Sequence, residues 1–262
     1  MPTPSARALR ALAMPVSAAS TGSTFYPAVE PPAGANAHDL EVAEFVPFST
    51  ADWPGHVVAT VYLQGCSWRC TYCFNPSWQS SQSDSAWQWA DVVAWMADRK
   101  GLLHGVVFSG GEPTRQSMLM SALAHTKEMG YKTGLHTAGP YPARLQRVLP
   151  LVDWVAIDIK GTPNDYAAIT GVPMAGEHAW RSLDILKDSG TDYEVRITVD
   201  PTVHTRDGIL GLVDTLTSQG VTRVVLQEAR AALANPEYAE ALGERGITDV
   251  LTHGDLHRLH VR

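Results

Sequence analysis

Strand-like and helix-like patterns alternate along most of the chain, and this alternation constrains the fold more than any other feature. Runs rich in β-branched and other apolar residues predict six strands, at 56–64, 105–108, 132–136, 154–159, 193–199 and 223–227. Apolar positions with helical spacing predict helices between them, at 86–99, 116–129, 142–149, 178–188 and 207–218. Strands that alternate with helices of this length indicate βαβ units around a parallel sheet.

The number of units narrows the fold further. Six strand–helix units are fewer than the eight of a closed barrel, so we predict an open, partial (β/α)6 barrel of the TIM type rather than a doubly wound sheet. A chain of 262 residues with 45% hydrophobic content is long enough for one such α/β domain. In either fold, ligands bind at the carboxyl ends of the strands, where functional side chains are expected.

The two ends of the chain differ from this core. Ala, Ser, Pro and Gly dominate the first 40 residues, and the first acidic residue is Glu30, which favours a disordered tail. Arg7 and Arg10 in this acid-free start also loosely resemble an organelle transit peptide, so that alternative stays open. We therefore divide the chain into a tail at 1–40, a core domain at 41–228 and a C-terminal extension at 229–262 that packs on the core.

The charge balance limits the partners of the chain. It has 20 Lys and Arg against 27 Asp and Glu, for a formal net charge of -7. A nucleic-acid groove needs a basic field, so this balance argues against nucleic-acid binding. No uninterrupted apolar run approaches the roughly 18 residues that a membrane-spanning helix requires. We expect a cytoplasmic protein that binds neither nucleic acid nor a membrane.

All three cysteines of the chain lie in one short loop, at Cys66, Cys70 and Cys73, with the spacing C-x3-C-x2-C. A secreted disulfide framework normally has an even number of cysteines at wider spacing. A loop this short can place three thiolates around one face of an iron–sulfur cluster. Three protein ligands for four irons leave one iron open for a substrate or cofactor. We therefore predict that the three cysteines bind metal and form the catalytic centre.

A zinc site with a histidine as fourth ligand is the structural alternative. Zinc sites usually combine one C-x2-4-C pair with a second ligand pair at a distance. The chain has no second cysteine pair, and no histidine lies within the loop. The pattern favours a cluster, and iron and sulfide analysis would separate it from a zinc-stabilised, non-enzymatic binding module.

With the aromatic Tyr72 before the third cysteine, the loop resembles the C-x3-C-x-Φ-C signature of the radical S-adenosylmethionine superfamily. The resemblance implies that the three cysteines ligate a [4Fe-4S] cluster. It also implies that the amino and carboxylate groups of S-adenosylmethionine chelate the open iron. Tyr72 stands where the family's aromatic residue contacts the adenine, a role compatible with simple packing beneath the loop.

A glycine-rich turn follows the second predicted strand, at Gly110, Gly111, Glu112 and Pro113. Two glycines without a Cβ let the backbone approach a ligand closely. Alone, this sequence would be a common turn. After the cysteine loop it closely resembles the glycine-rich motif of the family, which implies that the turn binds the methionine amino group of the cofactor.

Asp158 and Lys160 close the fourth predicted strand, where alternation places both side chains on the same face. A surface ion pair is the simplest interpretation. However, an Asp-x-Lys pattern at this strand resembles that of glycyl-radical-enzyme activases. The resemblance implies a position near the cofactor and near the glycine loop of a partner enzyme.

Three other polar side chains are candidates for the site. Arg196 lies in the apolar fifth strand, where a charge needs a partner, and a cofactor carboxylate or ribose would serve as well as an internal salt bridge. His136 ends the third strand and is either a cofactor contact or a locally satisfied histidine. His204, after the fifth strand, is a weaker candidate of the same kind.

Two further segments narrow the subfamily. Trp53-Pro54-Gly55 and Leu63-Gln64-Gly65-Cys66 resemble the opening of the short activating enzymes of anaerobic ribonucleoside-triphosphate reductase. Those proteins carry one cluster and no auxiliary cysteines, which fits a chain with three cysteines. The resemblance covers roughly residues 45–228. Phe74 departs from it, because these activases often have histidine there, and the stretch from Ala229 matches no part of the pattern.

The resemblance also implies a reaction and its partners. The enzyme would reductively cleave S-adenosylmethionine and remove a hydrogen from a glycine of a glycyl radical enzyme, most specifically anaerobic ribonucleotide reductase. A flavodoxin or ferredoxin would supply the electron. A radical enzyme that acts on a small molecule, similar to 7-carboxy-7-deazaguanine synthase, shares the architecture and cofactor and remains the alternative.

Overall fold

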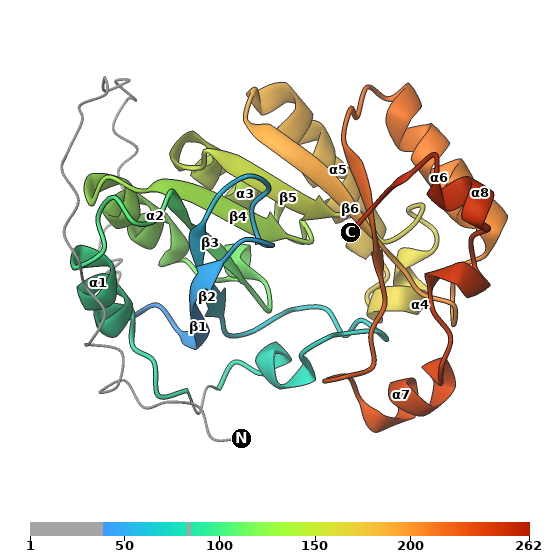
Figure 1. Ribbon diagram of the computed structural model, residues 1–262, viewed down its shortest axis with the longest axis horizontal. Helices are drawn as coiled ribbons and strands as arrows, with labels where there is room; N and C mark the ends of the chain where they lie inside the picture. Colours follow the sequence, from blue (N-terminus) through green and yellow to red (C-terminus); the bar gives the residue numbers. More distant parts are fainter. Residues whose placement is uncertain (1–38, 83–84) are drawn as a thin grey trace.

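Eight strands lie side by side in chain order in one curved sheet. The computed structural model that contains this sheet describes residues 39–82 and 85–262 (Figure 1). Within these residues β1 runs antiparallel to β2, and every later pair is parallel. The strands are β1 (Val42–Ser49), β2 (Val58–Leu63), β3 (Gly105–Gly110), β4 (Lys132–Thr137), β5 (Trp154–Asp158), β6 (Asp192–Val199), β7 (Val224–Glu228) and β8 (His260–Val261).

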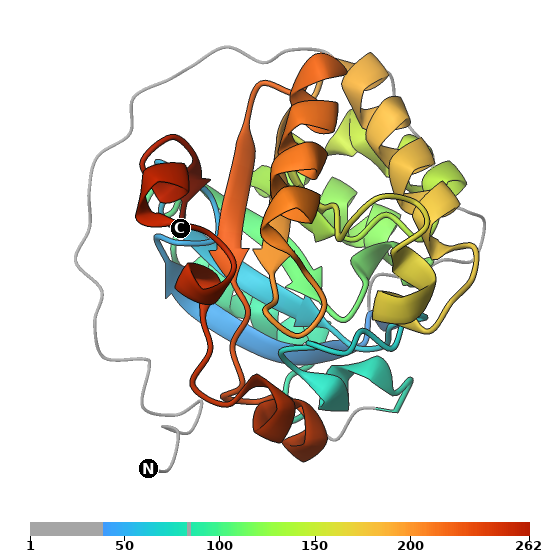
Figure 2. The same ribbon diagram turned by 90° about the vertical axis from the view of Figure 1, so that its right-hand side faces the viewer.

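Helices connect the parallel strands, and most of the longer ones lie along one side of the curved sheet (Figures 1 and 2). They are α1 (Trp89–Ala97), α2 (Leu119–Glu128), α3 (Pro142–Val148), α4 (Tyr166–Thr170), α5 (Ala175–Ser189), α6 (Arg206–Ser218), α7 (Pro236–Leu242) and α8 (His253–Leu256). Single 3-10 turns are η3 (Pro76–Gln79), η4 (Pro113–Arg115), η5 (Leu149–Leu151) and η6 (Ile247–Asp249). In the described part of the chain, no helix combines the length and the apolar character needed to cross a membrane.

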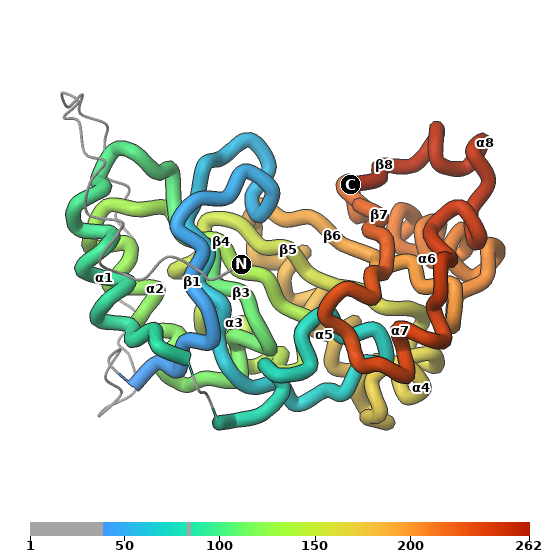
Figure 3. The backbone as a smooth tube through the Cα atoms, turned by 60° about the horizontal axis from the view of Figure 1, so that its bottom comes forward, coloured from blue at the N-terminus to red at the C-terminus, as the bar shows by residue number. Residues whose placement is uncertain are grey.

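The predicted open, partial (β/α)6 barrel is confirmed. The six predicted strands correspond to β2 through β7, and each boundary agrees within about two residues, the usual uncertainty of such assignments. Among the described strands, β1 and β8 do not pair with each other, so the barrel stays open between them. Figure 3 shows these two strands at opposite ends of the sheet.

Several elements have no counterpart in the sequence prediction. β1 contains Glu44 and Pro47, and its register with β2 is irregular. An edge strand tolerates both features, because one of its two sides forms no hydrogen bonds with another strand. α4 spans five residues and is too short to show helical periodicity. In the segment 229–262, the chain forms α7, η6, α8 and β8, with β8 added beside β7. The tail predicted at 1–40 lies outside the described residues except for its last two positions.

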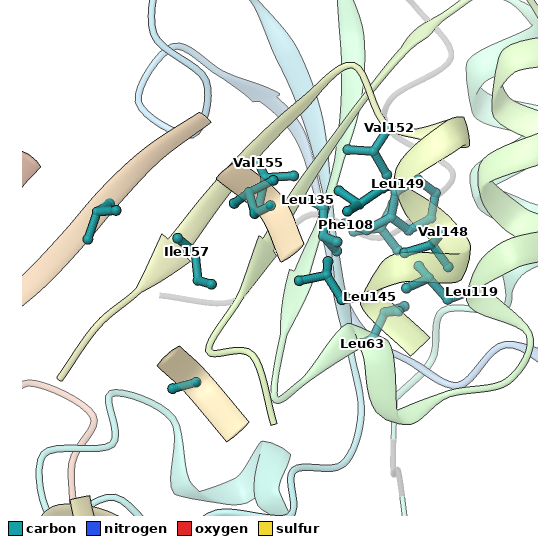
Figure 4. Close-up of a cluster of buried hydrophobic side chains, with 14 of the residues drawn as sticks. Leu63, Phe108, Leu119, Leu135, Leu145, Val148, Leu149, Val152, Val155 and Ile157 are labelled. Carbon is teal, nitrogen blue, oxygen red and sulfur yellow. The ribbon is translucent and has the colours of Figure 1, made fainter. Parts of the chain in front are cut away.

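Strand alternation separates an apolar helix-facing layer from the barrel interior. On β5, Val155 and Ile157 join the large core cluster, whereas Trp154 and Ala156 belong to a second cluster on the other face. Figure 4 shows the large core, where strand residues meet side chains of α2, α3 and the turn that follows α3. Its labelled members are Leu63, Phe108, Leu119, Leu135, Leu145, Val148, Leu149, Val152, Val155 and Ile157.

The second cluster fills the barrel interior near the amino ends of the strands. Trp53, in the β1–β2 connection, stacks on Trp154 with ring centroids 5.4 Å apart. Val58, Val107 and Ala156 complete this buried cluster. Because apolar side chains close the interior at this end, the space for a ligand lies toward the carboxyl ends of the strands.

Candidate functional site

A cavity with a volume of about 510 Å³ occupies the barrel interior and opens beside the cysteine loop. Its walls come from the loop after β2, the ends of β3 to β7 and the residue that follows β8. Ten of the twelve predicted site residues line it. They are Cys66, Cys70, Tyr72, Cys73, Gly110, Gly111, His136, Asp158, Lys160 and Arg196.

The cysteine loop is held in place from both sides. The Gln64 side-chain amide, which is buried, donates to the carbonyl oxygens of Ser77, Ser80 and Gln82 at 2.9–3.0 Å. On the other side, the backbone amides of Arg69 and Thr71 donate to the last carbonyls of α4, each at 2.9 Å. Gln64 therefore folds the following segment back over the loop, and α4 fixes the loop against the barrel. In Figure 1 this segment passes beside α4 and α7.

The three thiols are half-buried and free. Burial, with a smaller contribution from Glu112, raises the pKa of Cys66 to about 12. Burial also raises the pKa of Cys70, although the neighbouring Lys160 opposes this shift. A backbone amide donor helps to offset the burial of Cys66, since the N–H of Trp68 lies 3.4 Å from its sulfur. Cys66 and Cys70 therefore hold their protons without metal, and ligation releases them.

The donor set suits an iron–sulfur cluster. Cys66, Cys70 and Cys73 come from one loop and all three line the cavity. Soft thiolate ligands favour iron–sulfur clusters among metal sites, and in a cubane cluster each cysteine binds a different iron. Among the described residues, no group of three or more His, Cys, Asp or Glu side chains is arranged to hold a single metal ion.

The glycine turn packs against the stem of the cysteine loop. Gly110 has φ of 119°, and a Cβ there would collide with the backbone of Leu63. A Cβ at Gly111 would lie 2.5 Å from the carbonyl oxygen of Gly65. The amides of Gly111 and Glu112 donate to the Leu63 and Gly65 carbonyls, both at 2.9 Å. The glycines are thus required for close approach between two backbone segments, and both still face the cavity.

Glu112 and Pro113, the other two residues of the predicted motif, are buried behind the cavity wall and do not line it. The Glu112 carboxylate accepts from the Thr114 amide at 2.9 Å, the Thr137 hydroxyl at 2.8 Å and the Ala138 amide at 3.0 Å. Burial raises its pKa despite these bonds. Glu112 therefore ties the glycine turn to the end of β4.

Asp158 and Lys160 face the cavity beside the thiols. Lys160 Nζ lies 3.5 Å from Asp158 Oδ2 and 5.3 Å from the centre of the Tyr72 ring. Burial disfavours the charged ammonium, but Tyr72, Cys70 and Asp158 together outweigh it and hold the pKa of Lys160 well above its usual range. The lysine is a fixed cation in the wall, and the pair lies inside the barrel rather than on its outer surface.

Tyr72 is mostly enclosed by packing. Its ring forms a buried cluster with Ile169 of α4 and with Tyr238 and Leu242 of α7. Its hydroxyl is buried and has no hydrogen-bond partner among the described residues. Burial raises its pKa above the usual range. A buried hydroxyl without a partner is a group that a bound ligand or an ordered water would satisfy.

His204 lies outside the cavity wall. Its Nδ1 accepts from the Asp200 amide at 3.0 Å, so Nε2 carries the proton and donates to the Lys160 carbonyl at 3.0 Å. Burial lowers its pKa and keeps the ring neutral. The structure thus gives His204 a local role, since it holds the backbone of Lys160.

His136 and Arg196 meet inside the barrel. His136 Nε2 donates to the Asp52 carbonyl at 2.7 Å, and its Nδ1 lies 3.2 Å from Ser109 Oγ. Burial, reinforced by Arg196, lowers the pKa of His136 well below its usual range. Arg196 donates from Nε to Glu194 at 2.8 Å. Arg196 makes the internal salt bridge that the sequence analysis offered as one interpretation, and it also lines the cavity, so the predicted cofactor contact stays a prediction.

Several residues in the cavity wall or directly behind it were missed by the sequence analysis. Glu194 binds Arg196, and alternation could have indicated this pair because the two are separated by one residue on a strand. Arg262 also binds Glu194, at 2.9 and 3.0 Å, and had no local signal because strand pairing at β8 brings it there. Other cavity-lining residues that were not predicted include Asp52, Tyr62, Trp78, Thr198, Gln227 and Arg230.

Comparisons with known proteins agree with this geometry. The family described as the Radical SAM superfamily matches residues 60–214, more than half of the chain. A protein of Methanocaldococcus jannaschii named as a glycyl-radical enzyme activating enzyme is 28% identical over 185 residues, covering 67% of this chain and 75% of that protein. The pyruvate formate-lyase-activating enzyme of Clostridium pasteurianum is 31% identical over 160 residues, covering 58% of this chain and 65% of that enzyme.

A solved structure shares the fold. Streptococcus suis SuiB bound to S-adenosylmethionine superposes with a TM-score of 0.52 at 16% identity, over 64% of this chain and 39% of SuiB. At this identity the likeness concerns the fold alone. The parts of this chain outside the match include the segment that contributes β8 and Arg262 to the cavity, since the family match ends at residue 214.

Proposed function

Because the chain belongs to the radical SAM superfamily, whose members use a [4Fe-4S] cluster and S-adenosylmethionine, we propose that it activates a glycyl radical enzyme. The observation that carries the proposal is the shared cavity. Three thiols, the glycine turn and the Asp158–Lys160 pair all face one space of about 510 Å³. That volume lies within the range of pockets that hold small cofactors.

The chain's residues fit the cofactors in distinct ways. Cys66, Cys70 and Cys73 would bind the cluster, since these three thiols come from one loop and line the cavity. The backbone of Gly110 and Gly111 would receive the methionine amino group of S-adenosylmethionine. When bound, the cluster and S-adenosylmethionine supply a carbon-centred radical that removes a hydrogen atom.

The remaining wall residues orient the cofactor and keep water out. The ammonium of Lys160 stays charged beside the thiols and therefore offsets the negative charge that ligation creates. His136 stays neutral, so it adds no charge to the wall, and its bond to the Asp52 carbonyl fixes the ring in place. Stacked Trp53 and Trp154 close the floor and exclude solvent from the reacting atoms.

The names of the relatives favour an activase, while a 7-carboxy-7-deazaguanine synthase of Thermococcus kodakarensis, 28% identical over 161 residues, keeps the small-molecule alternative open. Two relatives with substantial coverage carry names of activating enzymes, one for glycyl-radical enzymes and one for pyruvate formate-lyase. The cavity rim also suits a protein partner, because Phe74 lines it and is 50% exposed. An exposed aromatic side chain at the mouth of a reactive cavity is typical of a surface that receives another macromolecule.

A direct assay tests the proposal. The protein is reconstituted with iron and sulfide without oxygen, reduced, and mixed with S-adenosylmethionine and anaerobic ribonucleotide reductase, our first choice of partner. Electron paramagnetic resonance should show a glycyl radical on the reductase, accompanied by 5′-deoxyadenosine. Dithionite and then flavodoxin or ferredoxin serve as reductants, and a protein donor that sustains the signal identifies the physiological class.

Matched variants give the controls. Cys70→Ala should lose most of the bound iron and all radical formation, whereas Met174→Ala, an exposed residue outside the cavity, should change neither. Formation of 5′-deoxyadenosine with no radical on any glycyl radical enzyme would reject the activase proposal and favour a small-molecule substrate. A colourless protein with one equivalent of zinc would reject the radical chemistry as a whole.

A further inference from the structure

The chain that follows β7 leaves the barrel and returns to the same place. Glu228 ends β7, and its carboxylate accepts from the backbone amide of Ile247 at 2.8 Å. Gly246 lies directly against this carboxylate, because a Cβ there would collide with Glu228 Oε1. The two ends of residues 230–245 therefore meet at one point, and α7 lies in the loop between them. Residues 230–245 are called the flap below.

The flap is fastened to the barrel mainly by apolar packing. Among the described residues, it makes one hydrogen bond to the rest of the chain, from Arg245 to the Pro201 carbonyl at 3.2 Å. None of the ion pairs found in that part of the chain includes a flap residue. In α7, only Tyr238 and Leu242 are buried, about one helical turn apart. These two side chains are the anchors of the flap.

Both anchors rest on the cysteine loop. Tyr238 and Leu242 form a buried cluster with Tyr72 and with Ile169 of α4. Figures 1 and 3 show α7 beside this part of the chain. Tyr72 also lines the cavity, so one side chain separates the anchors from the cofactor space. Displacing the flap would uncover Tyr72 without unfolding any strand of the barrel.

The seat of Tyr238 contains two buried polar atoms that do not satisfy each other. Asp200, in the turn after β6, is 0% exposed, and its Oδ1 accepts from the Thr202 amide at 2.8 Å. Neither Asp200 Oδ2 nor the Tyr238 hydroxyl has a hydrogen-bond partner among the described residues. The two groups are close, since burial and then the charge of Asp200 raise the pKa of Tyr238. Closure thus removes both groups from water without a well-aligned hydrogen bond in return.

This seat makes closure reversible. Burial of the Tyr238 ring and of Leu242 holds the flap closed, whereas the unpaired hydroxyl and carboxylate regain water when the flap opens. Closure is therefore weaker than the apolar contacts alone would make it. Gly243 follows α7 with φ of 57°, a backbone conformation that favours glycine, and it supplies a hinge at this end of the helix.

The surroundings of the seat indicate what displaces the flap. Leu233 lies between Ala231 and Ala234, which pack against the Tyr72 cluster, yet it is 55% exposed. Phe74, on the cysteine loop, is also largely exposed and lines the cavity. Exposed apolar side chains on both borders of the seat suit the surface of another protein, which could replace the contacts that the flap makes with Tyr72.

We propose that the flap is a movable cover of the cysteine loop, and that the protein substrate of the radical displaces it on docking. Tyr238 is a positioning residue, because its ring holds the flap closed and its unpaired hydroxyl keeps that closure weak. The identity of the partner rests on the proposed function. The movement of the flap does not depend on it.

Hydrogen exchange of the reconstituted protein, measured by mass spectrometry, tests the movement. Peptides that cover α7 should exchange at least about tenfold faster than peptides that cover α6, because the flap opens locally. Tyr238→Ala removes an anchor and should speed exchange in α7 by about tenfold more. Tyr238→Phe keeps the ring and deletes only the unpaired hydroxyl, so exchange in α7 should slow about fivefold.

Tyr131 provides the matched control. It is a buried tyrosine outside the flap, and its hydroxyl donates to the Met96 carbonyl at 2.7 Å. Tyr131→Phe should lower the thermal unfolding temperature and leave exchange in α7 unchanged. Faster exchange in Tyr238→Phe would mean that an ordered water satisfies the hydroxyl, which overturns the weak closure. Equal exchange in α7 and α6 of the wild-type protein would overturn the flap itself.

Glycyl radical formation on anaerobic ribonucleotide reductase tests the role of the movement. If docking requires the open flap, an open fraction that is about fivefold smaller in Tyr238→Phe raises the apparent KM for the reductase about fivefold and leaves kcat unchanged. An unchanged KM despite slower exchange would overturn the assignment to the protein substrate. A wild-type protein whose flap exchanges fast but which forms no radical on the reductase would reject the proposed function alone, so the two failures are distinguishable.

Discussion

Two carboxylates in this protein are each held between two arginines, and they behave differently because of where they lie. Glu194 on β6 binds Arg196 and Arg262, and we call these three residues the inner triad. Asp255, at α8, binds Arg206 of α6 and Arg258 in what we call the outer triad. Both carboxylates are at most 1% exposed. The chemistry of the two groups is the same, and only their surroundings differ.

The two triads differ in how far their arginines are exposed to water. In the outer triad, Arg206 is 44% and Arg258 is 73% exposed, and Asp207 lies 3.7 Å from Arg206, so water and a second carboxylate both screen the positive charge. In the inner triad the corresponding values are 8% for Arg196 and 28% for Arg262. The outer triad therefore acts as a link between α6 and α8. The inner triad is largely shielded from water, and both of its arginines line the cavity.

Removing the carboxylates should give the largest contrast. Glu194→Gln leaves two arginines with no counter-charge in the barrel and should lower the free energy of unfolding by about 3–5 kcal/mol. Asp255→Asn leaves arginines that water can solvate and should cost about 1–3 kcal/mol, mainly through lost hydrogen bonds. Urea unfolding at neutral pH measures both values. Equal costs would mean that burial of the arginines does not distinguish the triads.

Removing one arginine from each triad should give a smaller contrast. Arg262→Gln breaks two hydrogen bonds to Glu194 but leaves the bond from Arg196, so we expect a net loss of about 1–2 kcal/mol. Arg258→Gln removes a largely exposed partner and should cost about 0–1 kcal/mol. The same unfolding assay applies. A larger loss for Arg258→Gln would contradict the exposure argument.

High salt should change the stability costs of the two arginine variants differently, and we expect this difference to be smaller still. At about 1 M salt the screening length is about 3 Å, which weakens exposed ion pairs but reaches buried ones poorly. The cost of Arg258→Gln should therefore vanish at high salt, whereas most of the cost of Arg262→Gln should remain. Unfolding curves at low and high sodium chloride provide the measurement, with the wild-type protein corrected for general salt effects.

Acidification should give the smallest contrast, because hydrogen bonds from arginines lower the pKa of both carboxylates. For Asp255, bonds from Arg206 and Thr252 are the main cause. For Glu194, the bonds from Arg262 and Arg196 outweigh the effect of burial. A carboxylate whose pKa is lowered by folding stabilises the protein at pH values above its pKa in the unfolded chain, which is near 4. This stabilisation is lost as the pH falls through the pKa of the carboxylate in the folded protein.

Unfolding free energies measured from pH 6 downward should thus decline in the wild-type protein and decline less in Glu194→Gln and in Asp255→Asn. Each variant already lacks one of the two groups that must be protonated. A variant with the full wild-type slope would show that its carboxylate does not titrate between the folded and unfolded states.

The cavity's main features could be predicted because they depend on local sequence. The spacing of Cys66, Cys70 and Cys73 keeps the thiols in one loop regardless of what packs around it. Strand alternation similarly fixes that Asp158 and Lys160 share a face. Glu112 shows the limit of local sequence. Its motif predicted a residue that binds the cofactor in the cavity, but the side chain is buried behind the cavity wall and binds the backbone at the end of β4.

By itself, the sequence determined the six strand–helix units, the open barrel and the residues at the carboxyl ends of its strands, because periodicity and short-range spacing are encoded within each segment. Only the tertiary structure decided that Arg262, at the end of the sequence, completes a carboxylate on β6 and that its charge faces the cavity. The physical reason is that β8 reaches the sheet by pairing with β7 after a long connection. Neither that pairing nor the burial that preserves the charge has a signature in local sequence.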